Sequence, residues 1–153
     1  MKQNEKVAEI LNDLIQINND RVAGYEKASK DLGIGDGDLR TMFTEYASES
    51  RQFAMELKKY VFAEGEEPAK DTTLRGKIYR AWMDVKATFS GNDRKSVLES
   101  CEFGEDAAQR AYERALDETD VLPADIATVI SEQKRKLRKA HDQVKALRDK
   151  QYA

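Results

Sequence analysis

Apolar side chains recur every three or four residues through the first half of the chain, which is the spacing of one buried helix face. This pattern predicts a helix over about residues 2–30, ended by the glycines of DLGIGDGD. Asp36 or Asp38 is then expected to cap a second helix, which Gly65 and Pro68 would end.

The second half of the chain shows the same periodicity. One helix is expected from about Val97 to Leu116, and another from about Ile126 to Leu147, with Pro123 in its first turn. A shorter amphipathic segment, about 72–89, lies between the two halves.

The short segment selects the topology. The loops inside each half are tight and predict antiparallel neighbours, whereas the central connection holds roughly 18 helical residues, or ~27 Å. That length returns the chain to the end where the second helix began, so the second and third long helices should run parallel. We therefore predict an all-α, ferritin-like antiparallel four-helix bundle with a short crossover helix, formed as one domain over 1–153.

Charge and composition narrow the setting. The net charge of −3 disfavours general binding to nucleic acid or anionic membranes, and no apolar run approaches the ~18 residues of a membrane span. The chain has a single cysteine, Cys101, and its N-terminus lacks the apolar core of a secretory signal. We expect a cytoplasmic protein without membrane contact.

Several polar side chains fall inside the apolar stripes at mid-height of the predicted bundle, and we call them the polar layer. Glu105 should pair with Arg21, with Asn18 and Gln133 also satisfying its carboxylate. The six residues of the layer are Asn18, Arg21, Glu49, Ser50, Glu105 and Gln133.

Ferritin-like bundles can hold two metal ions at this height, with a Glu from each of two helices and a Glu-x-x-His from each of the others. Here Gln52 stands where Glu49-x-x-His would need histidine, and the chain has one histidine in all. A layer that fixes helix register is one interpretation, and a metal or small-ligand site is the other. Weak candidates for iron or manganese ligands are Glu49, Glu102, Glu105 and His141, and no cofactor is assigned.

Other signals favour ordinary structural roles. His141 is expected at the surface or boundary beside Asp142, and Tyr79 and Trp82 should pin the crossover helix to the bundle. The basic run 134–139 spreads its charges around the helix without interleaved aromatics, which favours a solvated face over a nucleic-acid site.

The sequence resembles a bacterial family of ferritin-like four-helix-bundle proteins of unknown function. The resemblance covers nearly the whole chain and rests on LNDLIQINNDRVAGYEKA, SESRQFAMELKKYV, GKIYRAWMDVKATFSGND, CEFGEDAAQRAYERAL and HDQVKALRD. It implies a ferritin-like fold, a cytoplasmic setting and a link to stress responses, and it supplies no catalytic residues. Tyr79 stands where the family's His-Arg-Ala-Trp segment would have histidine, which removes another metal ligand.

We expect a non-enzymatic structural or interaction protein that forms homo-oligomers. The alternative is a carboxylate-bridged iron or manganese protein of oxidase or storage type. A nucleic-acid-associated stress protein is the least favoured of the three.

Overall fold

The computed structural model describes residues 3–69, 94–118 and 120–151, and helices account for most of them. The prediction of an all-α chain is confirmed. The elements are α1 (Gln3–Asp31), the single-turn 3₁₀ helix η1 (Ile34–Asp36), α2 (Gly37–Ala63), α4 (Arg94–Leu116) and α5 (Ala124–Lys150). The predicted crossover helix over 72–89, with Tyr79 and Trp82, lies outside the described residues.

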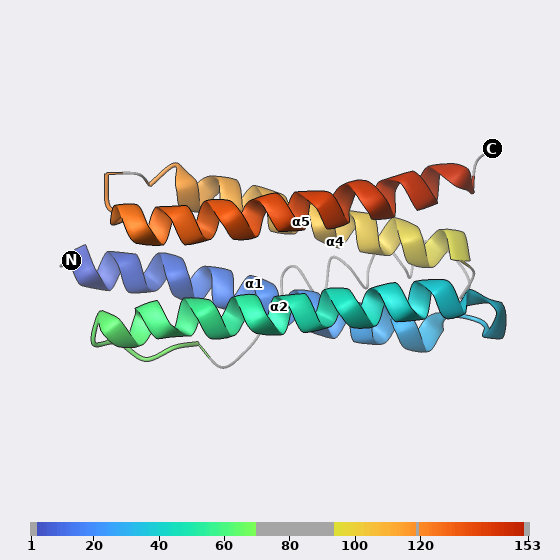
Figure 1. Ribbon diagram of the computed structural model, residues 1–153, viewed down its shortest axis with the longest axis horizontal. Coiled ribbons are helices and arrows are strands. Elements are labelled where there is room, and N and C mark those ends of the chain that lie inside the picture. Colours follow the sequence, from blue (N-terminus) through green and yellow to red (C-terminus); the bar gives the residue numbers. More distant parts are fainter. Residues whose placement is uncertain (1–2, 70–93, 119, 152–153) are drawn as a thin grey trace.

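The long helices form two antiparallel pairs, α1 with α2 and α4 with α5 (Figure 1). α1 also packs on α4, so α2 and α4 lie diagonally and run in the same direction. This arrangement confirms the ferritin-like bundle that the length of the crossover predicted.

The helix ends follow their local sequence with two corrections. Gly65 adopts φ +77°, a left-handed conformation that suits glycine after the end of α2. Asp36 does precede α2, but its carboxylate makes no capping bond to that helix and instead accepts from the Gly33 backbone and Arg94. Pro123 lies one residue before α5 rather than within its first turn, because the helix begins at Ala124.

The apolar core consists of two clusters, one toward each end of the bundle. The first includes Leu11, Leu57 and Ile130, and the second includes Phe43, Leu98 and the buried Cys101. Every long helix contributes to both clusters. Between them lie buried polar residues on α1, α2, α4 and α5, at the level of the predicted polar layer.

Within the described residues, no helix combines the length and apolar content that crossing a lipid bilayer would demand.

Candidate functional site

Arg21 lies at the centre of the bundle with 1% of its surface exposed. Its Nε donates to Glu105 Oε1 of α4 at 2.5 Å, and its Nη1 donates to Ser50 Oγ at 2.8 Å and Glu49 Oε1 at 3.0 Å on α2. Arg21 Nη2 and Glu105 Oε2 make no hydrogen bond to the described residues, so the pair is held by one charged bond rather than two. Four of the six predicted polar-layer residues thus meet at one guanidinium.

Two aromatic rings complete the surroundings of this guanidinium. Its Cζ lies 5.3 Å from the ring centroids of both Tyr25 and Tyr46, within the range of a cation–π contact. Burial alone would lower the pKa of Arg21, but the charge and hydrogen bond of Glu105 raise it above its usual value. Arg21 is therefore a fixed cation in the core.

The remaining two layer residues join a separate network centred on Tyr112. Asn18 Nδ2 donates to the Tyr112 hydroxyl at 2.8 Å, and that hydroxyl donates to Gln133 Oε1 at 2.7 Å. Gln133 Nε2 then donates to Glu56 Oε1 at 2.8 Å. Burial raises the pKa of the Tyr112 hydroxyl, so it remains protonated and can donate.

The expectation that Asn18 and Gln133 also satisfy Glu105 is wrong. Tyr112 follows Glu105 by two helical turns, and α1 runs antiparallel to α4, so Asn18 lies on the Tyr112 side of Arg21. Helical periodicity assigned Tyr112 no polar role. The available signal was its place two helical turns after Glu105 on the same helix.

The central layer does not fit the two metal ions that the fold can hold there. Such a centre needs about four carboxylates and two imidazoles around its ions. Here α1 contributes a guanidinium that already binds Glu49 and Glu105, and α5 contributes the amide of Gln133. A metal ion at this level would meet a buried positive charge and lose its two carboxylate ligands to it.

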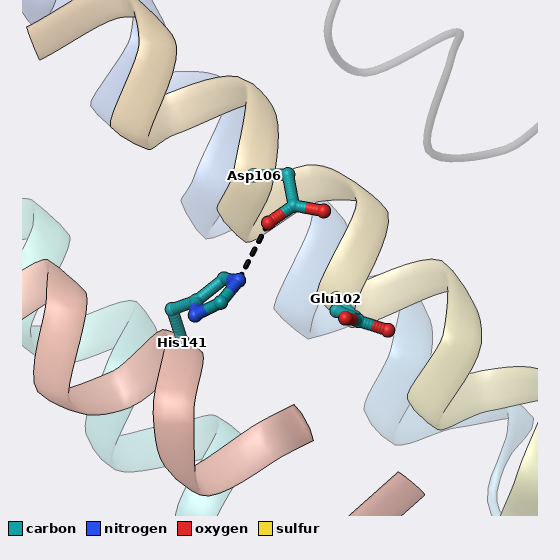
Figure 2. Close-up of side chains that lie close together, drawn as sticks. All are labelled: Glu102, Asp106 and His141. Carbon is teal, nitrogen blue, oxygen red and sulfur yellow. Dashed lines mark hydrogen bonds and ion pairs between the residues drawn. The ribbon is translucent and has the colours of Figure 1, made fainter. Parts of the chain in front are cut away.

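The four candidate metal ligands divide between two places. Glu49 and Glu105 hold Arg21, whereas Glu102 and His141 lie together at the seam between α4 and α5. Asp106, one turn after Glu102, joins them there (Figure 2). We call Glu102, Asp106 and His141 the seam cluster.

Asp106 was not predicted from the sequence, because the candidates were polar residues inside the apolar stripes. Its side chain is 43% exposed and lies outside them.

The seam cluster is tightly spaced and combines one imidazole with two carboxylates. One ligand atom from each residue lies within 4.8 Å of the others, and His141 Nε2 lies 2.5 Å from Asp106 Oδ1. His141 was expected at the surface or boundary beside Asp142, and its ring is buried. Its Nδ1 contacts Asp142 Oδ1 at 3.0 Å, and its other nitrogen faces Asp106 of α4. Glu102 also contacts Arg148, and burial raises the pKa of its carboxyl group.

A family model described as "Domain of unknown function (DUF2383)" matches residues 6–118. The chain belongs to this family. This result confirms the predicted membership of a family of unknown function. None of the curated proteins matches the chain.

Two solved structures share the architecture of this DUF2383 protein. A mutant of Dps1 from Mycobacterium smegmatis aligns with a TM-score of 0.84 and 16% identity over 96% of this chain and 97% of that one. A ferritin-like, diiron-carboxylate protein from Bacillus anthracis strain Ames aligns with a TM-score of 0.69 and 16% identity over 96% of both chains. At these identities the likeness establishes the ferritin-like fold alone.

Proposed function

We propose that this DUF2383 protein is a non-enzymatic ferritin-like bundle that acts through its surface as a structural or interaction protein. The position of Arg21 is the main support for this proposal. It places a permanent cation at the level where a di-metal centre would need carboxylates, and it occupies two of them. The polar layer then serves to fix the register of α1, α2 and α4.

Metal analysis of protein purified without chelator, together with an assay for oxygen-dependent oxidation of Fe²⁺, tests this proposal. We expect no metal pair and no oxidase activity that depends on Glu105. Two iron or manganese ions per chain, lost in Glu105→Ala, would contradict the proposal and favour the carboxylate-bridged alternative.

Self-association is the second part of the proposal, with another copy of this chain as the partner. Met55 and Phe62 are 62% and 66% exposed and lie two turns apart on the same side of α2. Large apolar side chains that share one outer face favour a protein contact.

Light scattering coupled to gel filtration tests self-association. We expect a mass of at least two chains, reduced in Met55→Lys/Phe62→Lys. The fully exposed Ile34 of η1 supplies a matched control, since Ile34→Lys removes an apolar side chain elsewhere. A monomeric wild type would overturn this part.

The proposal keeps the cytoplasmic location and the link to bacterial stress responses expected from the sequence. That link is tested by measuring the survival of cells that lack this protein when they are exposed to an oxidant. Reduced survival would support it, and unchanged survival would contradict it. The proposal does not include binding of nucleic acid. Retardation of duplex DNA by the protein in a gel at ~0.15 M salt would contradict the proposal.

A further inference from the structure

The seam cluster has a composition that the structural role of the core does not explain. We propose that Glu102, Asp106 and His141 form a mononuclear site for a divalent first-row transition metal ion. The site lies outside the central layer and does not rest on the proposed function.

The two helices supply the ligands from opposite sides. Glu102 and Asp106 are four residues apart on α4, so their carboxylates project from the same face of that helix. His141 projects from α5 toward them (Figure 2). A single ion with bond lengths of about 2.0–2.2 Å reaches ligand atoms up to about 4.4 Å apart. The ligand atoms of the cluster lie within 4.8 Å of one another, so small side-chain adjustments bring all three to one ion.

The contacts of the histidine ring are the second observation that points to a cation. A neutral imidazole has one N–H and one lone pair, so it can donate to only one carboxylate. His141 lies against two, with Asp142 Oδ1 3.0 Å from Nδ1 and Asp106 Oδ1 2.5 Å from Nε2. With Nδ1–H donated to Asp142, Nε2 faces Asp106, and these two electron-rich atoms suit a cation held by both, which is a proton in an imidazolium and a metal ion in the proposed site.

Asp142 contacts the His141 nitrogen that does not face Asp106, as carboxylates near metal-bound histidines commonly contact the nitrogen that does not bind the metal. Such a partner orients the ring, fixes its tautomer and increases the basicity of the ligating nitrogen. Here it leaves Nε2 directed at Asp106.

The surroundings also allow an ion to enter. His141 and Glu102 are nearly buried, with side-chain exposures of 9% and 12%, whereas Asp106 is 43% exposed and opens the cluster to solvent. Arg148 Nη1 donates to Oε2 of Glu102, and the same guanidinium also holds Asp149. This bond engages one carboxylate oxygen of Glu102, and the second oxygen is not part of it.

The donor set selects the class of ion. One imidazole nitrogen and two carboxylates suit Zn²⁺, Co²⁺, Mn²⁺ or Fe²⁺, whereas Mg²⁺ and Ca²⁺ prefer oxygen ligands alone. Three protein ligands leave at least one coordination position for water.

The sole histidine of the chain makes a direct test. Titration of the intact protein with Zn²⁺, followed by two-dimensional NMR of ¹⁵N-labelled imidazole, should shift the Nε2 resonance of His141 with an endpoint of one ion per chain. Co²⁺ should give visible absorption at the same endpoint, and Mg²⁺ should leave both signals unchanged.

Variants assign the ion to the cluster. Asp106→Asn keeps the size of a half-exposed side chain and should weaken Zn²⁺ binding at least about tenfold. Glu102→Gln should weaken it as well. The matched control is Glu113→Gln, which removes an exposed carboxylate from the same helix, and it should bind as the wild type does.

Three results would overturn the proposal. They are the absence of a His141 shift with Zn²⁺ in wild-type protein, binding unchanged in Asp106→Asn, and binding abolished by Glu105→Gln but not by Asp106→Asn. Only the last points to the central layer, so failure of this inference is distinguishable from failure of the proposed function. Thermal unfolding provides a second readout, because Zn²⁺ should raise the Tm of the wild type more than that of Asp106→Asn.

Discussion

Arg21 keeps a full charge at 1% exposure, and partners on two other helices compensate for its desolvation. Removing one member of a buried ion pair leaves the other charge without a partner in a medium of low dielectric, which destabilises the fold. The same atoms that exclude a metal centre therefore also tie α1 to α2 and α4.

At the residue scale we predict that Arg21→Met lowers the free energy of unfolding by about 3–5 kcal/mol, because Glu105 is left charged and buried. Urea denaturation followed by circular dichroism measures this loss. Arg21→Met/Glu105→Gln should recover much of the stability, since the stranded charge is gone. A loss below about 1 kcal/mol in the single variant would be inconsistent with a buried ion pair.

The end of α2 depends on the backbone of one glycine. Gly65 has φ +77°, and a Cβ added there would meet no atom within 4 Å, so the cost of substitution is conformational rather than steric. Gly65→Ala should therefore cost about 1–2 kcal/mol of stability, measured by urea denaturation.

Gly37 at the start of α2 is the matched control. Its φ of −58° is helical and a Cβ there also meets open space. Gly37→Ala should be neutral or stabilise by up to about 1 kcal/mol. Equal effects of the two substitutions would refute a left-handed requirement at Gly65.

The starts of α2 and α4 are joined by Arg94, which donates to Asp38 Oδ1 at 3.0 Å and Oδ2 at 2.8 Å. The hydrogen bond to Arg94 lowers the pKa of Asp38 from 3.8 to about 2. A lowered folded-state pKa means that the contribution of Asp38 is complete above its unfolded pKa of about 3.9 and is lost as pH falls toward 2.

We thus expect Asp38→Asn to lower the urea midpoint slightly at pH 6 and to have no effect near pH 2. The effect is small because Asp38 is exposed and screened by solvent. In an Arg94→Met background the same substitution should lose its pH dependence. If the difference between wild type and Asp38→Asn stayed constant from pH 6 to pH 2, the ion pair would not be its source.

At the scale of the whole molecule, the polar layer separates two apolar clusters without separating two folding units. Each long helix passes through both clusters, so a loss of packing in one cluster is transmitted to helices that also pack in the other. The ion pair and the Tyr112 network link the helices where the clusters meet.

We predict one cooperative unfolding transition. Leu11→Ala in the first cluster and Leu98→Ala in the second should each cost about 2–5 kcal/mol, and both should shift the whole transition. Far-UV circular dichroism, which follows the helices, and near-UV circular dichroism of the buried Tyr112 and Tyr25, one in each cluster, provide two independent probes. A biphasic transition in either variant would show that the clusters unfold separately.

The order and approximate extent of the four long helices follow from the sequence alone. Gly65 and the tight loops act on the local backbone, and periodic apolar positions define a single buried helix face. These signals can be identified without knowing which other helices pack against that face. The crossover length then limited the direction of α4 relative to α2. Helical phase also placed Arg21 and Glu105 in the core, and their charges predicted the pair.

Which polar side chains meet could not be predicted from the sequence and depends on how the helices pack. Asn18 and Gln133 bind Tyr112 rather than Glu105, and His141 meets Asp106 of another helix. Such contacts depend on axial register and side-chain direction between helices, where a shift of one turn, about 5.4 Å, exchanges one partner for the next. Periodicity gives the face on which a residue lies but not the level at which two helices are aligned.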